Sequence, residues 1–570
     1  MDDVDAVQAQ IARNMLDSGD WVTAHLDGVK YLEKSPLIYW AIAISYEIFG
    51  VHDWAARIPV ALSAILLSWL TFRIGAWAFS LLAGLYSGLT IATCIGLWLF
   101  TRIQIPDVTL TATIALALWA FLRTLDSEET RPALWSSVMA AAIGLGLILK
   151  GLIAAVFPIA AAVLYLAFTG LIRKRETWQR LHVLRGIAIA LAIAAPWHIL
   201  AMLRNPPYFD FAMTSGPGHY RGFFWFYFIN EHVLRFLNLR YPRDYNTVPR
   251  LYFWLFHLLW LFPWSVYFPA LGKLSFRGDD RASRTRLLCL CWAGFLLVFF
   301  TFSSTQEYYS MPAYPALALL LGSAITEPSV AVWRRRGQMV LAVVTGLALI
   351  AISIILLNVW NLPAPGDISQ ALVQHREDYT LSLGHMGDLT IKSFAYLKLP
   401  LLIAGMAFLI GSRSAIRGSH AGSVAMMILF FHAARLALIT FDPYLASRQL
   451  AAAVNSAPHG KLILDDSYYA YSSVVFYADA YHGQPILLLN GLVNNLEFGS
   501  NAPGAPHEVF IDDAQFVQRW LSPQQYYVVA AKTQVERFER LVGRENLYTL
   551  ADSGGKFVFA NRRIVYEASR

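Results

Sequence analysis

Charged residues that border long apolar runs are the first candidates for chemistry in this sequence. When the apolar runs are threaded through a bilayer, all of these charges fall on the same side. Charges close to the hydrocarbon are costly, so a cluster of them at one face indicates a functional site. The pattern predicts an integral membrane enzyme whose active site lies at that face. The residues concerned are Asp2, Asp3, Asp5, Glu33, Lys34, Asp107, Lys150, Glu231, His232 and Arg235.

Some of these charges also have simpler interpretations. An aspartate that caps a helix contributes about 1 kcal/mol, but one aspartate suffices and the chain opens with three. Glu33 and Lys34 alone are typical of a solvated surface. Pro36 and the amphipathic run 37–49 follow them, which favours the membrane interface, where a lysine can bind a lipid phosphate. For Asp107, just outside an apolar run, a helix cap and a functional role both stay open.

The composition excludes an ordinary soluble protein. Charged residues make up only 15% of the 570 residues, and apolar residues make up 57%, whereas soluble domains are about 25% charged. The mean hydropathy is +0.46, and a net charge of +7 accompanies a pI near 9.1. The basic residues lie in short loops between apolar runs, which is the positive-inside pattern of membrane proteins and disfavours nucleic-acid binding. The three cysteines lie inside apolar runs, so neither a disulfide framework nor a thiolate metal site is expected.

Twelve apolar runs approach the length of roughly 20 residues that a membrane span requires. They are 55–77, 80–99, 105–123, 132–149, 152–171, 184–203, 251–272, 285–303, 311–326, 338–360, 396–412 and 421–441. Strongly basic loops alternate with the others and are expected in the cytoplasm; they are 173–185, 273–286, 334–336 and 413–417. The opposite loops are then expected outside, as is everything after residue 442; they are 1–50, 100–104, 204–250, 304–310 and 361–395.

The predicted fold is a polytopic α-helical membrane protein with a small α/β domain outside the membrane. The topology places residue 1 outside without an export signal, so we expect one further span before Met1. After about residue 445, short β-rich runs alternate with Gly, Pro and a charged helical stretch at 534–542, which predicts the α/β domain. The expected divisions are a first outer loop with interfacial amphipathic helices (1–50), a transmembrane domain (51–441) and an extracytoplasmic domain (442–570).

Short motifs follow one another from the start of the chain to residue 312. They are an Asp-rich opening, Ala12-Arg13-Asn14-Met15-Leu16, Ser18-Gly19-Asp20-Trp21-Val22, Tyr31-Leu32-Glu33-Lys34, Ala56-Arg57-Ile58-Pro59, Ile105-Pro106-Asp107, Leu149-Lys150-Gly151, Pro196-Trp197, Asn230-Glu231-His232, Phe262-Pro263-Trp264 and Tyr309-Ser310-Met311-Pro312. In this order and approximate spacing they resemble the superfamily of aminoarabinose transferases and protein O-mannosyltransferases. Its members are polytopic type-C glycosyltransferases that take a sugar from a polyprenyl phosphate carrier. Several motifs in one order are far more specific than any single motif.

The resemblance implies acids that act on the acceptor. The family's first-loop catalytic acid, which serves as base on the acceptor hydroxyl or orients it, belongs to the segment 2–5. Its usual position falls on Val4, so a shift of one residue is needed; Asp3 is favoured, with Asp5 second. A second acidic position of the family falls on Asp107.

The resemblance also implies groups that bind the donor. Lys34 aligns with the residue expected to bind the carrier phosphate and stabilise the leaving group. A phosphate near lipid needs several donors, and the full expected set is Lys34, Lys150, Arg235, Arg240, Tyr31 and Tyr309. Tyr309 is equally well explained as an interfacial aromatic. Glu33 and His232 resemble a metal-binding pair of the aminoarabinose type, so a divalent, zinc-like ion is the one cofactor implied; a hydrogen-bonded interface histidine is the alternative.

One motif departs from the family. Aminoarabinose transferases carry lysines before a Leu-Pro-x-Tyr sequence, in the loop that here reads Ser303-Ser304-Thr305-Gln306-Glu307-Tyr308-Tyr309. The absence of these lysines argues against aminoarabinose as the sugar and lipid A as the acceptor, and leaves the polyprenyl phosphate chemistry in place.

We therefore predict an inverting glycosyltransferase of a bacterial-type inner membrane, with its active site and C-terminal domain facing the periplasm. Its expected partners are a polyprenyl-phosphate sugar donor, membrane lipids, and a lipid, glycan or protein acceptor. The alternative from another class is a transporter or flippase of lipid-linked sugars, which would place charges near the midplane of spans and broken helices in matching halves. A noncatalytic binder of lipid-linked sugars also stays open.

Overall fold

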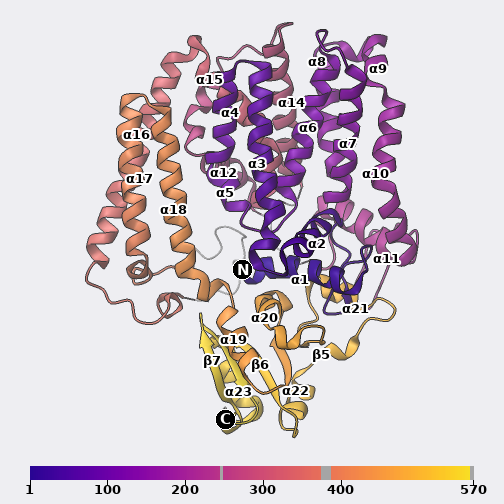
Figure 1. Ribbon diagram of the computed structural model, residues 1–570, viewed down its shortest axis with the longest axis vertical. Coiled ribbons are helices and arrows are strands. Elements are labelled where there is room, and N and C mark those ends of the chain that lie inside the picture. The colour runs from indigo at the N-terminus through magenta and orange to yellow at the C-terminus, as the bar shows by residue number, and fades with distance from the viewer. Residues whose placement is uncertain (244–247, 304, 374–386, 565–570) are drawn as a thin grey trace.

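In the computed structural model, a bundle of long helices adjoins a smaller domain built on a β-sheet (Figure 1). The structure describes residues 1–243, 248–303, 305–373 and 387–564. Ser304 and parts of the predicted outer loops 204–250 and 361–395 lie outside these ranges. The chain begins with α1 (Asp3–Ser18), the short antiparallel pair β1 (His25–Leu26) and β2 (Val29–Lys30), and α2 (Leu37–Phe49). These elements lie at the end of the bundle that faces the smaller domain.

The bundle follows the predicted apolar runs, each of which is helical over most of its length. Its helices are α3 (Asp53–Ala78), α4 (Leu81–Thr93), α5 (Ile95–Phe100), α6 (Asp107–Leu125), α7 (Pro132–Lys150), α8 (Ile153–Phe168), α9 (Arg175–Leu181), α10 (Val183–Arg204), α11 (Gly222–Phe224), α12 (Arg250–Trp260), α13 (Phe268–Leu271), α14 (Arg281–Phe302), α15 (Tyr314–Thr326), α16 (Ala331–Val359), α17 (Lys398–Arg417) and α18 (His420–Leu445).

The number of long helices is smaller than the predicted twelve spans. In the described part of the chain, eight helices are long and apolar enough to cross a membrane, and nine if a pair bent by 100° counts as one span. α4, α8 and α15 are apolar but shorter. α4 ends at Thr93 because Cys94 has extended backbone. The bend falls after α12 beside Pro263, which has no N–H for a helical hydrogen bond. Twelve spans are therefore not confirmed.

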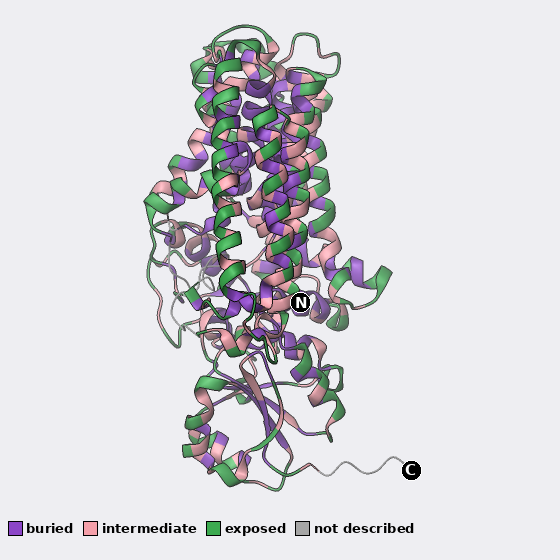
Figure 2. Cartoon of the chain, turned by 90° about the vertical axis from the view of Figure 1, so that its left-hand side faces the viewer, coloured by how far each residue is buried: buried purple, intermediate pink, exposed green. Residues whose placement is uncertain are grey.

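The outer faces of the long helices are apolar and exposed. Figure 2 shows exposed residues along the outside of the bundle and buried residues along its axis. On α16, for example, Leu347 is 62% exposed and Leu357 is 80% exposed. Soluble monomers rarely expose apolar surface of this extent. The helices therefore fit a multi-pass membrane protein whose outer faces contact lipid.

The smaller domain contains a six-stranded mixed sheet of order β5-β4-β3-β6-β8-β7. The first four of these strands are parallel, and β8 and β7 are antiparallel. Helices pack on both faces of the sheet, so its central strands read as apolar runs. The elements are α19 (Arg448–Ser456), β3 (Lys461–Asp465), α20 (Ser472–Tyr477), β4 (Leu487–Leu489), α21 (Asn494–Ser500), β5 (Phe510–Ile511), α22 (Asp513–Trp520), β6 (Tyr526–Ala531), α23 (Val535–Val542), β7 (Tyr548–Ser553) and β8 (Lys556–Ala560). The small α/β domain predicted after about residue 445 is therefore present.

The C-terminal domain docks onto α1 through a buried acid. Asp3 forms an ion pair of 2.6 Å with Lys556 of β8. It also accepts hydrogen bonds from Oγ of Ser473 at 2.6 Å and Oγ of Ser447 at 3.1 Å. The start of the chain and the C-terminal domain therefore form one continuous structure.

A second buried acid at this junction carries an unfavourable charge. Asp27, in the turn between β1 and β2, accepts a hydrogen bond at Oδ1 from the N–H of Ile486 at 3.0 Å, and its buried Oδ2 has no partner among the described residues. Burial raises the pKa of Asp27 to about 7. The folded protein then keeps a proton that the unfolded chain loses near pH 4. This acid therefore destabilises the fold increasingly as the pH rises from about 4 to about 7.

Asp27→Asn is expected to stabilise the protein, and to do so more at pH 8 than at pH 5. Asparagine keeps the acceptor for Ile486, removes the buried charge, and tolerates the positive φ of 51° at this position. We expect a rise of a few degrees in the unfolding temperature of the detergent-solubilised full chain at pH 8. The exposed Asp552→Asn is the control. An equal effect of Asp27→Asn at both pH values would contradict the assignment.

Candidate functional site

A cavity of about 400 Å³ lies where the N-terminal segment meets the ends of several bundle helices. Its walls come from the segment after β2, the start of α6, the end of α7, the start of α8, the π-helix η2 (Trp225–Leu234), the end of α14, and the 3₁₀ helix η4 (Glu307–Ala313). Six charged residues that the sequence singled out line it together: Glu33, Lys34, Asp107, Lys150, Glu231 and Arg235. These six residues come from four separate segments of the sequence and converge on one space.

A glycine allows two of these segments to approach closely. Gly151, directly after Lys150 at the end of α7, has a φ of +73°, which favours glycine. A Cβ at this position would collide with the ring of His232 on η2. The ring instead accepts a hydrogen bond at Nε2 from the N–H of Leu152, at 3.0 Å. The motif Leu149-Lys150-Gly151 therefore holds the end of α7 against η2.

Two carboxylates, two guanidinium groups and an amide form a closed ring of polar contacts beside the cavity. Oε1 of Glu33 lies 3.6 Å from Nη1 of Arg235, and Arg235 pairs with Glu231. Oε1 of Glu231 accepts a hydrogen bond from Nε of Arg240 at 2.5 Å. Asn495 of α21 accepts from Nη2 of Arg240 at 2.7 Å and donates to Oε2 of Glu33 at 2.6 Å. We call these five residues the charged ring.

Lys34 is attached to the charged ring through Glu33. Its Nζ lies 2.5 Å from Oε1 of Glu33. Burial opposes ionisation of Glu33, but Lys34, Arg240 and Arg235 together hold the pKa of this carboxyl well below its ordinary range. Glu33 is thus an ionised anchor that keeps Lys34 and Arg235 side by side at the cavity.

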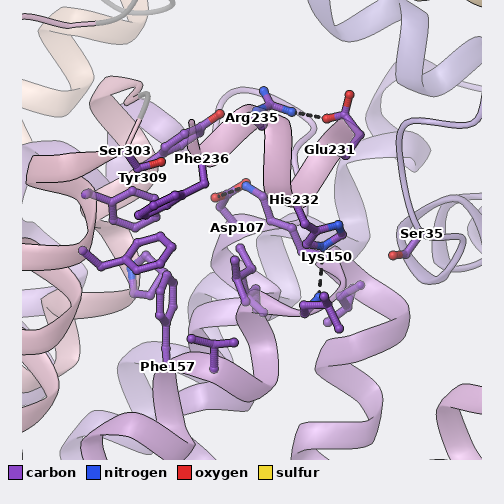
Figure 3. Close-up of a pocket in the computed structure, with 18 of the residues that line it drawn as sticks. Ser35, Asp107, Lys150, Phe157, Glu231, His232, Arg235, Phe236, Ser303 and Tyr309 are labelled. Carbon is purple, nitrogen blue, oxygen red and sulfur yellow. Dashed lines mark hydrogen bonds and ion pairs between the residues drawn. The ribbon is translucent and has the colours of Figure 1, made fainter. Parts of the chain in front are cut away.

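A second ion pair lines the cavity (Figure 3). Nζ of Lys150 lies 2.5 Å from Oδ1 of Asp107, and 5.2 and 5.4 Å from the ring centres of Tyr308 and Tyr309. Oδ2 of Asp107 is buried and has no hydrogen-bond partner among the described residues. Buried polar atoms are normally satisfied, so a lone carboxylate oxygen at a cavity can accept a hydrogen bond from a bound hydroxyl.

The rest of the cavity wall is apolar and largely aromatic. Phe299 packs against Phe157 and Phe236, with ring centres 5.3 and 5.0 Å apart. Val156 and Leu237 also line this part. The six charged lining residues are three acids and three bases. Arg240, which lies behind the wall and contacts Glu231, adds a fourth base. The cavity therefore suits an amphipathic molecule with an anionic head and an apolar chain.

The predicted metal-binding pair already has protein partners. His232 donates from Nδ1 to the carbonyl of Tyr227 at 2.6 Å, and its Nε2 accepts from Leu152. Burial lowers the pKa of His232, which favours this neutral form. Both oxygens of Glu33 accept hydrogen bonds. Oε1 accepts from Lys34, and Oε2 accepts from Tyr31 at 2.9 Å and from Asn495. In the described ranges, no group of three or more His, Cys, Asp or Glu could hold a metal ion. The residues present do not form a metal site in this arrangement.

The first-loop acids do not line the cavity. Side chains two residues apart on a helix are rotated by about 200° around the helix axis. Asp3 and Asp5 of α1 therefore contact different neighbours. Asp3 pairs with Lys556 of the C-terminal domain, as described above. Asp5 is fully buried, lies 2.5 Å from Nη2 of Arg57 on α3, and accepts from the N–H of Gln104 at 2.8 Å. Both are embedded in contacts that join the N-terminal segment to its surroundings.

Most of the predicted donor-binding residues come together, and two stand one layer behind the wall. Tyr309 lines the cavity beside Lys150. Arg240 and Tyr31 contact Glu33 or Glu231 without lining the cavity. The sequence did not predict Asn495, which belongs to no motif and comes from the distant C-terminal domain.

A larger cavity elsewhere lacks these groups. It has a volume of about 950 Å³, lies between α3, α5 and α18, and is lined by Arg57, Trp98, Arg102, Phe431 and Arg435 among others. Of the charged residues that the sequence singled out, Asp2 lines this cavity, whereas six line the smaller one. The smaller cavity is therefore the candidate site because of the charged residues that line it, although its volume is smaller.

Known proteins resemble this chain in sequence and in fold. The family model described as dolichyl-phosphate-mannose-protein mannosyltransferase matches residues 33–200. The undecaprenyl phosphate-alpha-4-amino-4-deoxy-L-arabinose arabinosyl transferase of Aeromonas salmonicida is 30% identical over 328 residues, which cover 56% of this chain and 55% of that protein. One of Pseudomonas fluorescens is 30% identical over 351 residues, with 56% and 51% covered. The chain thus spans about half the length of the curated relatives it matches.

The likeness in fold extends over nearly the whole chain. The crystal structure of ArnT from Cupriavidus metallidurans in the apo state superposes with a TM-score of 0.75 over 99% of this chain and 93% of that chain, at 23% identity. The chain therefore shares the fold of ArnT over nearly its full length. The same ArnT bound to undecaprenyl phosphate gives a TM-score of 0.74 at 23% identity, covering 98% and 93%. The sequence matches and the shared fold together support the type-C glycosyltransferase superfamily that the short motifs predicted.

Proposed function

We propose that this protein transfers a sugar, with inversion, from a polyprenyl-phosphate carrier to an acceptor outside the cytoplasm. The observation that carries the proposal is the cavity in which Lys34 and Arg235, held by Glu33, face an aromatic wall. Basic groups match a phosphate, and the apolar wall matches an isoprenoid chain. The relatives and the ArnT complex, whose names refer to undecaprenyl phosphate, support this choice of donor.

The residues of the cavity supply the steps of a single displacement. The acceptor oxygen would attack the anomeric carbon as the bond from that carbon to the phosphate oxygen breaks, and polyprenyl phosphate would leave with the electron pair. Lys34 and Arg235 would stabilise the charge on the leaving phosphate, assisted by Lys150. Oδ2 of Asp107 would accept the proton of the acceptor hydroxyl, because this carboxylate oxygen at the cavity has no hydrogen-bond partner among the described residues. Asp3 and Asp5, the acids favoured by the motif alignment, stay candidates for the same role.

The positions of the charges favour an enzyme over a transporter. Asp107 is the first residue of α6, and Lys150 is the last residue of α7. A transporter is expected to hold such charges near the bilayer midplane, at interrupted helices. The polar groups instead gather at one end of the bundle, next to the C-terminal domain.

We further propose that this end faces the periplasm of a bacterial-type inner membrane. The basic loops lie at the end of the bundle opposite the C-terminal domain, where α9 forms part of one of them (Figure 1). The positive-inside rule assigns these loops to the cytoplasm. Under this topology the short and bent helices α4, α8, α12 and α15 complete the twelve spans. The segment 1–50 and the domain 442–570 then lie outside the membrane.

The orientation can be measured by cysteine labelling of intact cells or right-side-out vesicles. A cysteine at exposed Thr214 or Glu508 is expected to react with a membrane-impermeant maleimide, whereas a cysteine at Arg336 is expected to react only after the membrane is opened. The native cysteines are buried and provide a low background. Labelling of position 336 from outside would contradict the orientation.

The proposed reaction is tested by mass spectrometry of envelope glycolipids and glycoproteins from cells with and without the gene. A glycoconjugate that disappears with the gene, and is formed again by the full chain from a polyprenyl-phosphate sugar, would identify the sugar and the acceptor. If the full chain binds the donor but no glycoconjugate depends on the gene, the chain is a binder of lipid-linked sugars, and the transferase proposal is wrong.

A further inference from the structure

The short helix α21 of the C-terminal domain packs against η2, beside the cavity in which we propose that the donor binds. Its Phe498 stacks on Phe226 of η2 with ring centres 4.2 Å apart, and on Trp225 at 5.8 Å. Its Glu497 accepts a hydrogen bond from the hydroxyl of Tyr241 at 2.5 Å. α21 therefore contacts both η2 and the loop that carries Arg240, at the junction of bundle and domain (Figure 1).

Asn495 is the residue of α21 that reaches the charged groups. It is only 4% exposed. Its Nδ2 donates to Oε2 of Glu33 at 2.6 Å and lies 3.2 Å from the hydroxyl oxygen of Tyr31. Its Oδ1 accepts from Nη2 of Arg240 at 2.7 Å. One amide thus contacts an acid and a base of the charged ring.

The chemistry of this position favours an amide over any charged side chain. A carboxylate could accept from Arg240 but would repel the ionised Glu33. A lysine or arginine could donate to Glu33 but would repel Arg240. An amide has a donor and an acceptor on one rigid plane, so it can satisfy both neighbours at once. Its orientation is fixed by the charges on either side.

We propose that Asn495 is a positioning residue of the donor site, through which the C-terminal domain sets the phosphate-binding cations. The inference rests on the proposed function and adds a participant from outside the membrane domain. Glu33 fixes both Lys34 and Arg235, and Arg240 fixes Glu231, which holds Arg235 from its other side. Loss of the amide would release Glu33 and Arg240 together, although Asn495 itself does not line the cavity.

The test measures binding of undecaprenyl phosphate to the detergent-solubilised full chain. Asn495→Asp keeps the size and the acceptor for Arg240 but places a second carboxylate against Glu33. We expect its affinity for undecaprenyl phosphate to fall about 10-fold or more, the usual effect of losing a hydrogen bond to a charged group. Asn501→Ala is the matched control, because the Asn501 side chain, at the C-cap of α21, bonds only to the backbone of Glu497 among the described residues.

A pH series separates positioning from mere stability. Two adjoining carboxyls share a proton as the pH falls, and that proton restores a donor between position 495 and Glu33. The affinity ratio of Asn495→Asp to wild type is therefore expected to recover between pH 8 and pH 5, while the ratio for Asn501→Ala stays constant. Unfolding temperatures recorded in parallel show whether each variant is folded.

The outcomes distinguish the two proposals. If the wild-type chain does not bind undecaprenyl phosphate, the proposed function fails. If the wild type binds, and folded Asn495→Asp binds equally well at pH 8, the positioning role of Asn495 is wrong while the proposed function stands. A loss of affinity that does not change with pH would also overturn the positioning role.

Discussion

Asp107→Asn is expected to lower the turnover number about 100-fold or more, the range of a lost general base. Asparagine keeps an oxygen for the hydrogen bond from Lys150, which lies 2.5 Å from Oδ1 of Asp107. It removes the carboxylate that would accept the acceptor proton. Since the proposed phosphate-binding groups are other residues, the KM for the donor should change little. The measurement is the steady-state rate of formation of the glycoconjugate identified by mass spectrometry.

The same assay on Asp3→Asn and Asp5→Asn distinguishes the three candidate acids. Because Asp3 pairs with Lys556 and Asp5 with Arg57, away from the cavity, these variants are expected to lower the unfolding temperature and to retain more turnover than Asp107→Asn. If Asp107→Asn turns over at the wild-type rate while a folded Asp3 or Asp5 variant is inactive, the first-loop acid is the base and the assignment of Asp107 is wrong.

Lys34→Ala is expected to raise the KM for the donor about 10- to 100-fold, as for loss of a hydrogen bond to a charged group. Without Lys34, the donor phosphate loses its cation beside the apolar wall, and Glu33 loses a partner 2.5 Å away. The turnover number should fall as well, because the same cation would stabilise the leaving group. Steady-state kinetics over a range of donor concentrations measure both effects.

Lys30→Ala is the matched control for this variant. Lys30 lies four residues earlier, on β2, and does not line the cavity, so its removal should leave donor use unchanged. Lys34→Arg keeps the positive charge and should recover part of the donor affinity. A Lys34→Ala protein that uses the donor like the wild type would show that the phosphate binds elsewhere.

The fold could be predicted largely from the sequence, because apolar runs of membrane length are unambiguous. Each predicted run is helical, and the β-rich runs after residue 445 form the strands of a small sheet domain. The number of spans could not be predicted in the same way. Where α4 ends at Cys94, or α12 bends beside Pro263, hydropathy stays high although the helix stops. Backbone breaks inside apolar segments leave little trace in a hydropathy profile.

The site could be predicted in part. Short motifs located Lys34, Asp107, Lys150 and Arg235, which do converge on one cavity. The motif alignment placed the first-loop acid on Val4 and its neighbours, but helix geometry turns Asp3 and Asp5 toward different parts of the protein. Asn495 could not be found at all, because its proximity to Glu33 depends on how the C-terminal domain docks.

The most direct test of the donor cavity is photocrosslinking with an undecaprenyl phosphate analogue that carries a diazirine in its isoprenoid chain. After irradiation of the full chain in membranes, mass spectrometry is expected to find the label on peptides containing Phe157, Phe236 or Phe299, the aromatic wall of the cavity. Excess undecaprenyl phosphate should suppress this labelling, and Lys34→Ala should weaken it. Labelling that is confined to the second cavity, around Trp98 and Phe431, or that excess undecaprenyl phosphate does not suppress, would contradict the assignment of the donor site.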